Sequence, residues 1–111
     1  MALYAFVALK YEAPLERIQQ TVDRHRAYLR ELLAQGKMVC SGPFVPREGG
    51  GLLLRIEDRS EIGPLLAKDP YHVENLVSDT IYVWDPNIGR EGLDSLVPRP
   101  RLRVSLTPPA A

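Results

Sequence analysis

The chain has 111 residues, 45% of them hydrophobic, and its 14 basic and 14 acidic residues give a formal net charge of zero. That size supports one modest hydrophobic core, and the balanced charge excludes a general attraction to nucleic acid or to an anionic membrane surface. No apolar run can span a bilayer, no signal pattern opens the chain, and one cysteine excludes an internal disulfide, so we expect a cytoplasmic protein without nucleic-acid or membrane partners.

The first half of the chain predicts a strand, a long helix and a β-hairpin. Residues 3–11 are rich in tyrosine, phenylalanine, valine and alanine, which favour a strand. Residues 14–36 carry apolar side chains at steps of three and four, which is typical of one face of a helix, and this segment opens on a proline and closes on a glycine. We then expect a second strand over 37–45, a glycine-containing loop over 46–51 and a third strand over 52–57.

The second half predicts two short helices and a fourth strand. Ser60 is expected to cap a helix over 61–68. The Asp69-Pro70 pair then starts another short helix, because aspartate is a favoured cap and proline suits the first helical position. A strand over 79–84 completes the order β-α-β-β-α-β. This order is the split βαβ arrangement of ferredoxin-like α+β folds, with an antiparallel sheet.

The predicted strands are apolar on both faces, although two helices cover only one face of such a sheet. Tyr4 and Phe6 alternate with Ala5 and Val7 in the first strand, and the last strand continues the pattern at Tyr82. Monomers rarely expose an apolar patch of that size. We therefore expect a homodimer in which two sheets stack face to face, which is the arrangement of a dimeric α+β barrel.

The composition changes after the fourth strand, which divides the chain into a domain over 1–85 and a proline-rich C-terminal extension over 86–111. Within the extension, Leu102, Val104 and Leu106 alternate with polar residues, as in a short amphipathic strand. Such a strand is suited to the sheet edge of a neighbouring subunit, with which it would be exchanged. The alternative is a partly ordered tail.

One residue interrupts the apolar stripe of the long helix. The step after Val22 lands on His25, and an imidazole placed there loses hydration and needs a hydrogen-bond partner. The simpler interpretation is a core histidine bonded to a backbone carbonyl or a water. The alternative is a general acid or base, which works best with a carboxylate on its second nitrogen. Asp69 is the candidate for that carboxylate, although Asp-Pro is also a common helix cap.

Two further features are candidates for a ligand site. Ser41, Gly42 and Pro43 stand in the second strand, where glycine permits close approach of a ligand and the serine hydroxyl can bind a substrate oxygen. A bent edge strand is the simpler interpretation of the same segment. Tyr28 and Tyr71 are suited to wall a pocket for an aromatic ligand, or to ordinary core packing.

The sequence disfavours a metal or cofactor site. Asp69, His72 and Glu74 are possible hard-metal ligands that lie close together, but no set of cysteines and histidines has zinc spacing. Cys40 has no cationic activator near it in sequence, so we expect a small buried side chain rather than a nucleophile. We expect neither a metal nor a cofactor.

In combination, these segments resemble the YciI-like family of small bacterial proteins, which carry the YCII-related domain. The resemblance implies a dimeric α+β barrel with a His-Asp pair as its active site, and those roles fall on His25 and Asp69. Members usually have phenylalanine after Asp-Pro, so Tyr71 adds a hydroxyl to the implied pocket. The resemblance covers about residues 1 to 85 and rests on Leu3-Tyr4-Ala5-Phe6-Val7, Arg24-His25-Arg26-Ala27-Tyr28-Leu29, Ser41-Gly42-Pro43-Phe44, Asp69-Pro70-Tyr71 and Ile81-Tyr82-Val83-Trp84.

The resemblance also implies a class of chemistry. One branch of the family is a dehydrochlorinase that removes chloride from a chlorinated hydroxyquinol in aromatic degradation. The expected function is therefore a cofactor-free lyase or isomerase that acts on a hydroxylated ring or enol. His25 would remove a hydroxyl proton, Asp69 would orient the imidazole, and Ser41 would hold a second oxygen. The expected substrate contacts are Gly42, Pro43, Tyr71 and Tyr28. The alternative is a dimer that binds a small ligand, or serves as a scaffold, without catalysis.

Overall fold

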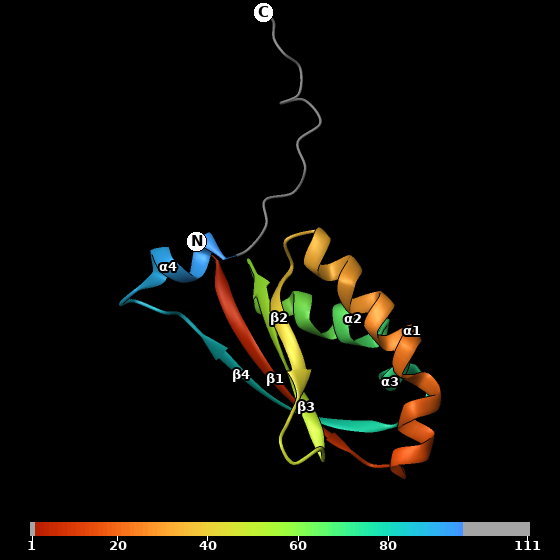
Figure 1. Cartoon of the computed structure of the whole chain (residues 1–111). Coiled ribbons are helices and arrows are strands. Elements are labelled where there is room, and N and C mark those ends of the chain that lie inside the picture. Colours follow the sequence, from red (N-terminus) through yellow and green to blue (C-terminus); the bar gives the residue numbers. More distant parts are fainter. Residues whose placement is uncertain (1, 97–111) are drawn as a thin grey trace, which may run out of the picture.

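The computed structural model describes residues 2–96 of the chain. Its centre is a four-stranded antiparallel sheet in the order β2-β3-β1-β4 (Figure 1). This topology confirms the expected β-α-β-β-α-β order and the ferredoxin-like α+β fold. The strands are β1 (Leu3–Tyr11), β2 (Met38–Pro43), β3 (Gly49–Ile56) and β4 (Val77–Trp84).

Three helices cover one face of the sheet (Figure 1): α1 (Leu15–Ala34), α2 (Ile62–Ala67) and α3 (Pro70–Val73). Helix α1 begins after Pro14, which is its N-cap, and the chain leaves it through Gly36 at a φ of 75°. The buried face of α1 follows the predicted period and comprises Ile18, Thr21, His25, Leu29 and Leu32. This stripe packs on the inward side chains of the sheet, so the histidine lies inside the helix–sheet core.

The consecutive glycines 49–51 lie in β3 rather than in the expected loop, so the strand begins three residues early. The physical reason is close packing against β1. A Cβ atom on Gly49 would lie 1.9 Å from the carbonyl oxygen of Leu9, and one on Gly51 would lie 2.8 Å from the ring of Phe6. Only glycine lets the backbones pair at that separation.

Asp58, and not Ser60, caps the segment that leads into α2. The Asp58 carboxylate accepts a hydrogen bond from the Ser60 amide at 2.9 Å, and the Glu61 carboxylate accepts one from the Asp58 amide at 2.8 Å. This reciprocal capping box starts a 3₁₀ turn, η1 (Arg59–Glu61), that continues into the helix. The cap expected at Asp69 is confirmed for α3.

The edge strand β2 ends at Pro43, and its register against β3 shifts between Met38 and Cys40. Cys40 is exposed rather than buried, because it lies on an edge strand in register with Leu53, which pairs with Phe6 on the face opposite α1, α2 and α3.

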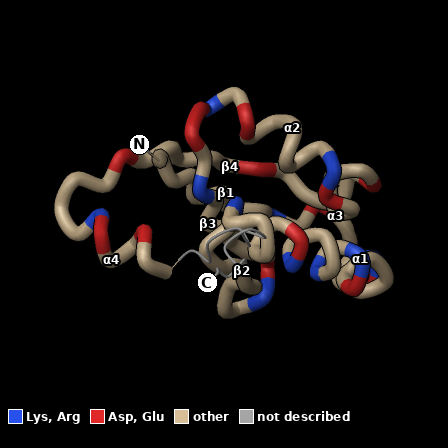
Figure 2. Tube along the Cα trace, turned by 90° about the horizontal axis from the view of Figure 1, so that it is seen from above, with Lys and Arg blue, Asp and Glu red and all other residues tan. Residues whose placement is uncertain are grey.

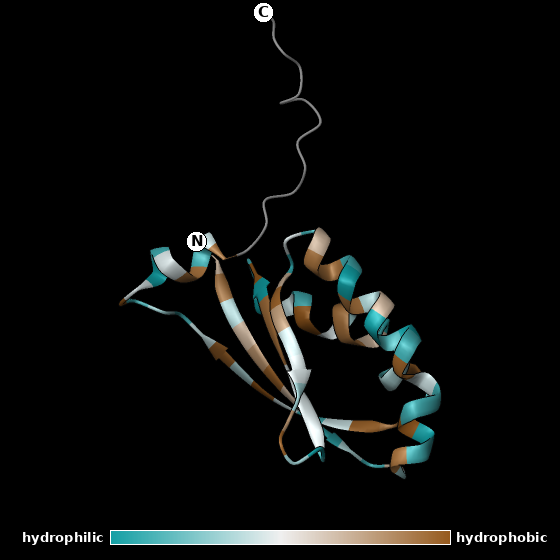
Figure 3. Ribbon diagram, in the orientation of Figure 1, coloured by the Kyte–Doolittle hydropathy of each residue, from teal (hydrophilic) through white to brown (hydrophobic). Residues whose placement is uncertain are grey.

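Large apolar side chains extend from that second face of the sheet, and hydrophobic positions recur along the ribbons of β1 and β4 (Figure 3). Phe6 is 38% exposed, Tyr82 is 60% exposed and Trp84 is 53% exposed. The register places Phe6 opposite Tyr82, and Tyr4 opposite Trp84, on this face across β1 and β4. Tyr4 is fully buried, with Leu93 packed against it, so the exposed part of the surface is formed by Phe6, Tyr82 and Trp84. Helix α1, on the opposite side of the sheet, carries both acidic and basic residues (Figure 2).

The start of the C-terminal extension forms a helix that the sequence pattern did not predict. Helix α4 (Arg90–Ser95) begins after Gly89, which has a φ of 85°. Arg90 is buried, donates a hydrogen bond to the Ala2 carbonyl at 2.5 Å and forms an ion pair with Asp85. The Tyr4 hydroxyl donates to the Asp94 carboxylate, so α4 is held at the end of β1. The amphipathic strand expected at 102–106 lies outside the described residues.

No helix among residues 2–96 combines the length and the hydropathy that a bilayer span requires.

Candidate active site

The site is organised around the cap of helix α3. Asp69 has an extended backbone conformation, and its Oδ1 atom accepts a hydrogen bond from the Tyr71 amide at 3.1 Å. Pro70 occupies the first helical position, where its missing amide costs nothing. The local sequence therefore fixes the direction of the carboxylate, which is 1% exposed and points at α1.

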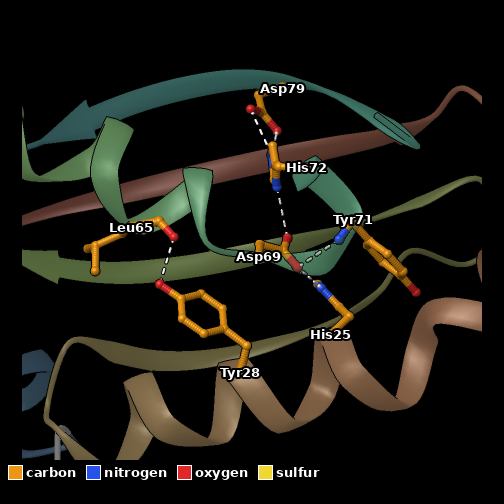
Figure 4. Close-up of polar contacts among 7 residues, drawn as sticks. All are labelled: His25, Tyr28, Leu65, Asp69, Tyr71, His72 and Asp79. Atoms are coloured by element: carbon orange, nitrogen blue, oxygen red, sulfur yellow. Dashed lines mark hydrogen bonds and ion pairs between the residues drawn. The ribbon is translucent and has the colours of Figure 1, made fainter. Parts of the chain in front are cut away.

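His25 of α1 meets that carboxylate across the core. Its Nδ1 atom donates a hydrogen bond to Asp69 Oδ1 at 2.6 Å (Figure 4). A carboxylate on Nδ1 holds the proton on that nitrogen and leaves Nε2 as the basic position of the neutral ring. Within residues 2–96, Nε2 has no hydrogen-bond partner. The arrangement is that of an imidazole oriented by a carboxylate, with one ring nitrogen left free.

The second oxygen of Asp69 faces another imidazole. His72 Nδ1 lies 2.9 Å from Asp69 Oδ2, and its Nε2 lies 2.7 Å and 2.9 Å from the two oxygens of Asp79 in β4 (Figure 4). Because both nitrogens face carboxylates, both must donate, which requires the imidazolium form. Four groups therefore form a continuous chain from His25 to Asp79.

The pKa directions agree with this geometry. Burial by itself would raise the pKa of Asp69, but its hydrogen bonds with His25 and His72 outweigh that effect and hold the pKa below its usual range. Burial would lower the pKa of His72, and here the hydrogen bonds to Asp69 and Asp79 outweigh it and raise the pKa. Both shifts favour the charged forms, a carboxylate at Asp69 and an imidazolium at His72.

Tyr71 holds the ring of His25 in place. The two rings stack with centroids 3.7 Å apart and planes 11° from parallel. Tyr71 is itself 3% exposed and packs edge-on against Tyr11 at 6.4 Å. Burial raises the pKa of the Tyr71 phenol. The imidazole is thus fixed by a hydrogen bond at one edge and a ring on one face.

A cavity of about 420 Å³ lies against this pair, between α1 and the β2–β3 hairpin. Its volume falls in the range that suits a small-molecule ligand. His25 and Tyr71 line it, and the opposite wall includes Ser41, Gly42 and Pro43 of β2. Five of the seven residues singled out from the sequence therefore share one cavity, with Asp69 behind His25.

Tyr28 lies elsewhere. It is not among the residues that line the cavity, and its hydroxyl donates to the Leu65 carbonyl at 2.7 Å (Figure 4). This hydrogen bond connects α1 to α2. Burial raises the pKa of its phenol, as expected for a hydroxyl used in packing.

Sequence reasoning missed several residues of the site. His72 had been considered only as a metal ligand, and Asp79 not at all. A signal for Asp79 existed, because it is the single carboxylate on the strand face that also carries Val77, Ile81 and Val83. The three charged residues of the cavity lining were also missed, namely Arg26, Arg30 and Arg47. Nothing in their exposed, polar setting distinguishes them in sequence.

The described residues contain no group of three or more histidines, cysteines and carboxylates arranged to hold a metal. Glu74, one of the three ligands weighed from the sequence, turns away from Asp69. It forms ion pairs with Arg17 at 2.8 Å and with Arg24 at 2.5 Å and accepts a hydrogen bond from Thr21. Its role is to fasten the end of α3 to α1.

Two solved structures share this fold at low sequence identity. One is 5-chloro-2-hydroxyhydroquinone dehydrochlorinase from Burkholderia phenoliruptrix AC1100, in complex with 2,5-dihydroxybenzoquinone. It has a TM-score of 0.64 and 20% identity, over 77% of this chain and 95% of the enzyme. The other is a conserved protein from Methanosarcina mazei Go1, with a TM-score of 0.53 and 13% identity, over 78% of this chain and 95% of that protein.

The curated proteins contain no significant match to this sequence. The family comparison is more informative, because the model of the YCII-related domain matches residues 2–85, which include all four strands and both members of the His25–Asp69 pair. A match over that much of the chain, with the fold to accompany it, identifies the protein as a member of the YCII-related domain family.

Proposed function

We propose that this protein is a cofactor-free enzyme that uses His25 as a general base on a small hydroxylated ring. The observation that carries the proposal is the hydrogen bond between His25 and a buried Asp69 at the wall of a ligand-sized cavity. Asp69 directs the free Nε2 toward the substrate and stabilises the imidazolium that forms when it takes a proton.

The reaction we propose first is an elimination of chloride. His25 removes a hydroxyl proton from a chlorinated trihydroxybenzene, and the electron pair of that O–H bond moves into the ring. Ring tautomerisation and cleavage of the C–Cl bond then release chloride. The net change is loss of one proton and one chloride, which leaves a hydroxyquinone and requires no oxidant. Ser41 lines the facing wall of the cavity, and we propose that its hydroxyl holds a second oxygen.

The structural similarity supports this choice of substrate. The dehydrochlorinase of known structure acts on a chlorinated hydroxyhydroquinone and was captured with a dihydroxybenzoquinone. At its low sequence identity to this chain, the similarity supports a shared fold and not a shared activity, so the reaction must be tested directly. The same base would serve an isomerase if the substrate offers no leaving group.

The decisive experiment measures chloride release from 5-chloro-2-hydroxyhydroquinone. The wild-type protein is compared with His25→Gln and with Arg59→Gln, a matched control because Arg59 is exposed and outside the cavity. General base catalysis predicts a loss of about 10²–10⁴-fold in His25→Gln and wild-type activity in the control. Chloride release that is unchanged in His25→Gln contradicts the proposed role. No release by the wild type, with ligand still bound, favours the non-catalytic alternative.

We also propose that the functional form is a dimer that stacks the uncovered faces of two sheets. The exposed rings of Phe6, Tyr82 and Trp84 support this, since a monomer would leave them in water. The test is sedimentation velocity on Trp84→Glu, with Leu15→Glu as control, because Leu15 is an exposed apolar residue at the start of α1. We expect the first variant to be a monomer and the second a dimer, and a wild-type monomer would contradict the proposal.

A further inference from the structure

The charged residues that line the cavity all have the same sign. Arg26 and Arg30 project from one side of α1, four residues apart, and Arg47 comes from the segment between β2 and β3. No aspartate or glutamate is among the lining residues. The chain as a whole has no excess of positive charge, with 14 basic and 14 acidic residues, so this concentration is local.

These arginines are not committed to ion pairs. Within residues 2–96, the arginines in ion pairs are Arg17, Arg24 and Arg90, all outside the cavity. Arg47 donates only a long hydrogen bond, of 3.3 Å, to the hydroxyl of Tyr11, which also lines the cavity. The guanidinium groups are therefore available to a ligand.

The positive charges of two of these arginines act on Tyr71, which lines the cavity. Burial raises the pKa of the Tyr71 phenol, and Tyr11 adds to the increase, but the charges of Arg47 and Arg26 both oppose it. Arg47 and Arg26 therefore lie close enough to the Tyr71 hydroxyl to act on a charge there, while burial, Tyr11 and Asp69 keep the pKa of the phenol raised.

We propose that this cavity selects aromatic ligands that carry an anionic oxygen, a ring carboxylate or an ionised hydroxyl, through Arg26, Arg30 and Arg47. Guanidinium groups bind such oxygens with charge-assisted and often bidentate hydrogen bonds. The apolar body of the ring packs against Val22, Leu29 and Leu52, which line the same cavity. This inference rests on the proposed function and narrows its substrate to anions.

The arginines would also assist the proposed proton transfer. When His25 removes a hydroxyl proton, negative charge develops on the ring oxygen. Guanidinium groups near that oxygen stabilise the developing charge. The Asp69 carboxylate would thus stabilise the imidazolium that forms, and the arginines would stabilise the oxyanion that forms, in the same proton transfer.

The test compares two ligands of the same shape, 2,5-dihydroxybenzoate and 2,5-dihydroxybenzamide, by isothermal titration calorimetry. We expect the anion to bind about tenfold more tightly than the neutral amide to the wild type, equivalent to ~1.4 kcal/mol. Arg26→Gln, Arg30→Gln and Arg47→Gln each reduce that preference, whereas Arg59→Gln leaves it unchanged. Raising the salt concentration weakens binding of the anion more than that of the amide.

The outcomes separate this inference from the proposed reaction. Equal affinity for the two ligands, or no binding of either, overturns the anion preference, even if chloride release is observed with a neutral substrate. An anion preference that the arginine variants abolish supports the inference, even if no turnover is found. Thermal unfolding of each variant shows whether a loss of binding is only a loss of fold. A variant that combines Arg26→Gln, Arg30→Gln and Arg47→Gln completes the series, and an anion preference that survives in it also overturns the proposal.

Discussion

His25 Nδ1 lies 2.6 Å from Asp69 Oδ1, although 44 residues separate the two in the chain. The pair is almost fully buried, with His25 8% exposed and Asp69 1% exposed. A buried carboxylate is unfavourable unless its oxygens are satisfied. Here the Tyr71 amide and two imidazoles satisfy them, so the fold can keep a charge inside its core beside a ligand-sized cavity.

The tautomer of His25 should depend on Asp69. In the wild type we expect the neutral ring to carry its proton on Nδ1, because the carboxylate accepts it. In Asp69→Asn the side-chain amide no longer enforces this choice, so both tautomers become populated and activity falls by about 10²–10⁴-fold. The ¹⁵N chemical shifts of the ring nitrogens measure the tautomers directly. A wild-type ring protonated on Nε2 would contradict the orientation on which the mechanism depends.

The charge of His72 should contribute stability that is lost at alkaline pH. Its pKa is raised above the ordinary 6.5 by Asp69 and Asp79, against the opposing effect of burial. The imidazolium therefore stabilises the fold fully below about pH 6.5, and this contribution is lost as pH rises through the folded-state pKa. We expect the free energy of unfolding to decline over that window in the wild type. The decline is smaller in Asp79→Asn and absent in His72→Asn.

A complementary effect is expected at acid pH from Asp69. Its pKa is held below the ordinary value of 3.8, despite burial, by hydrogen bonds with the two histidines. The ionised form stabilises the fold above that ordinary value, and the stabilisation is lost as pH falls through the folded-state pKa. Urea unfolding between neutral and acid pH measures it. A wild type and an Asp69→Asn variant with the same acid dependence would contradict this assignment.

We expect the ring of Tyr71, and not its hydroxyl, to orient His25. Tyr71→Phe keeps the stacking at 3.7 Å and should retain activity within a few-fold of the wild type. Tyr71→Ala removes a buried aromatic ring and should cost about 3–5 kcal/mol of stability, as large-to-small core substitutions do. Chemical denaturation and chloride release on the same samples separate the two effects. A Phe variant as inactive as the Ala variant would assign the role to the hydroxyl.

Tyr28 should matter for stability and not for ligand binding. Its hydroxyl donates to the Leu65 carbonyl at 2.7 Å, and Tyr28 does not line the cavity. Tyr28→Phe removes one neutral hydrogen bond and should cost about 1 kcal/mol. Calorimetric affinity for 2,5-dihydroxybenzoate should be unchanged. A weaker affinity without a loss of stability would restore the pocket role considered from the sequence.

Any side chain in place of Gly49, at the start of β3, should destabilise the fold. A Cβ atom on Gly49 would lie 1.9 Å from the carbonyl oxygen of Leu9, so Gly49→Ala must displace backbone and should cost about 3 kcal/mol. Gly63 of α2 is the matched control, because a Cβ atom there meets nothing within 4 Å. Gly63→Ala should be neutral or stabilising by about 0.5–1 kcal/mol, since alanine favours a helix. Midpoints of thermal unfolding measure both changes.

The sequence by itself determined the order of the elements and the nature of two central residues. Helix α1 follows from apolar residues at helical spacing, and the same spacing singles out His25 as a polar residue on the buried face. The cap at Asp69 follows from the proline after it. These are properties of neighbouring residues, and local backbone geometry is enough to specify them.

Only the tertiary structure decided which groups meet. The register of β1 against β4 and the packing of α3 on α1 bring Asp79, His72, Asp69 and His25 into one chain of hydrogen bonds, and no local pattern encodes those distances. The same holds for Arg26 and Arg47, which are unremarkable surface residues until α1 and the β2–β3 hairpin enclose a common cavity. Local propensity depends on adjacent residues, whereas a site depends on separations set by the whole sheet.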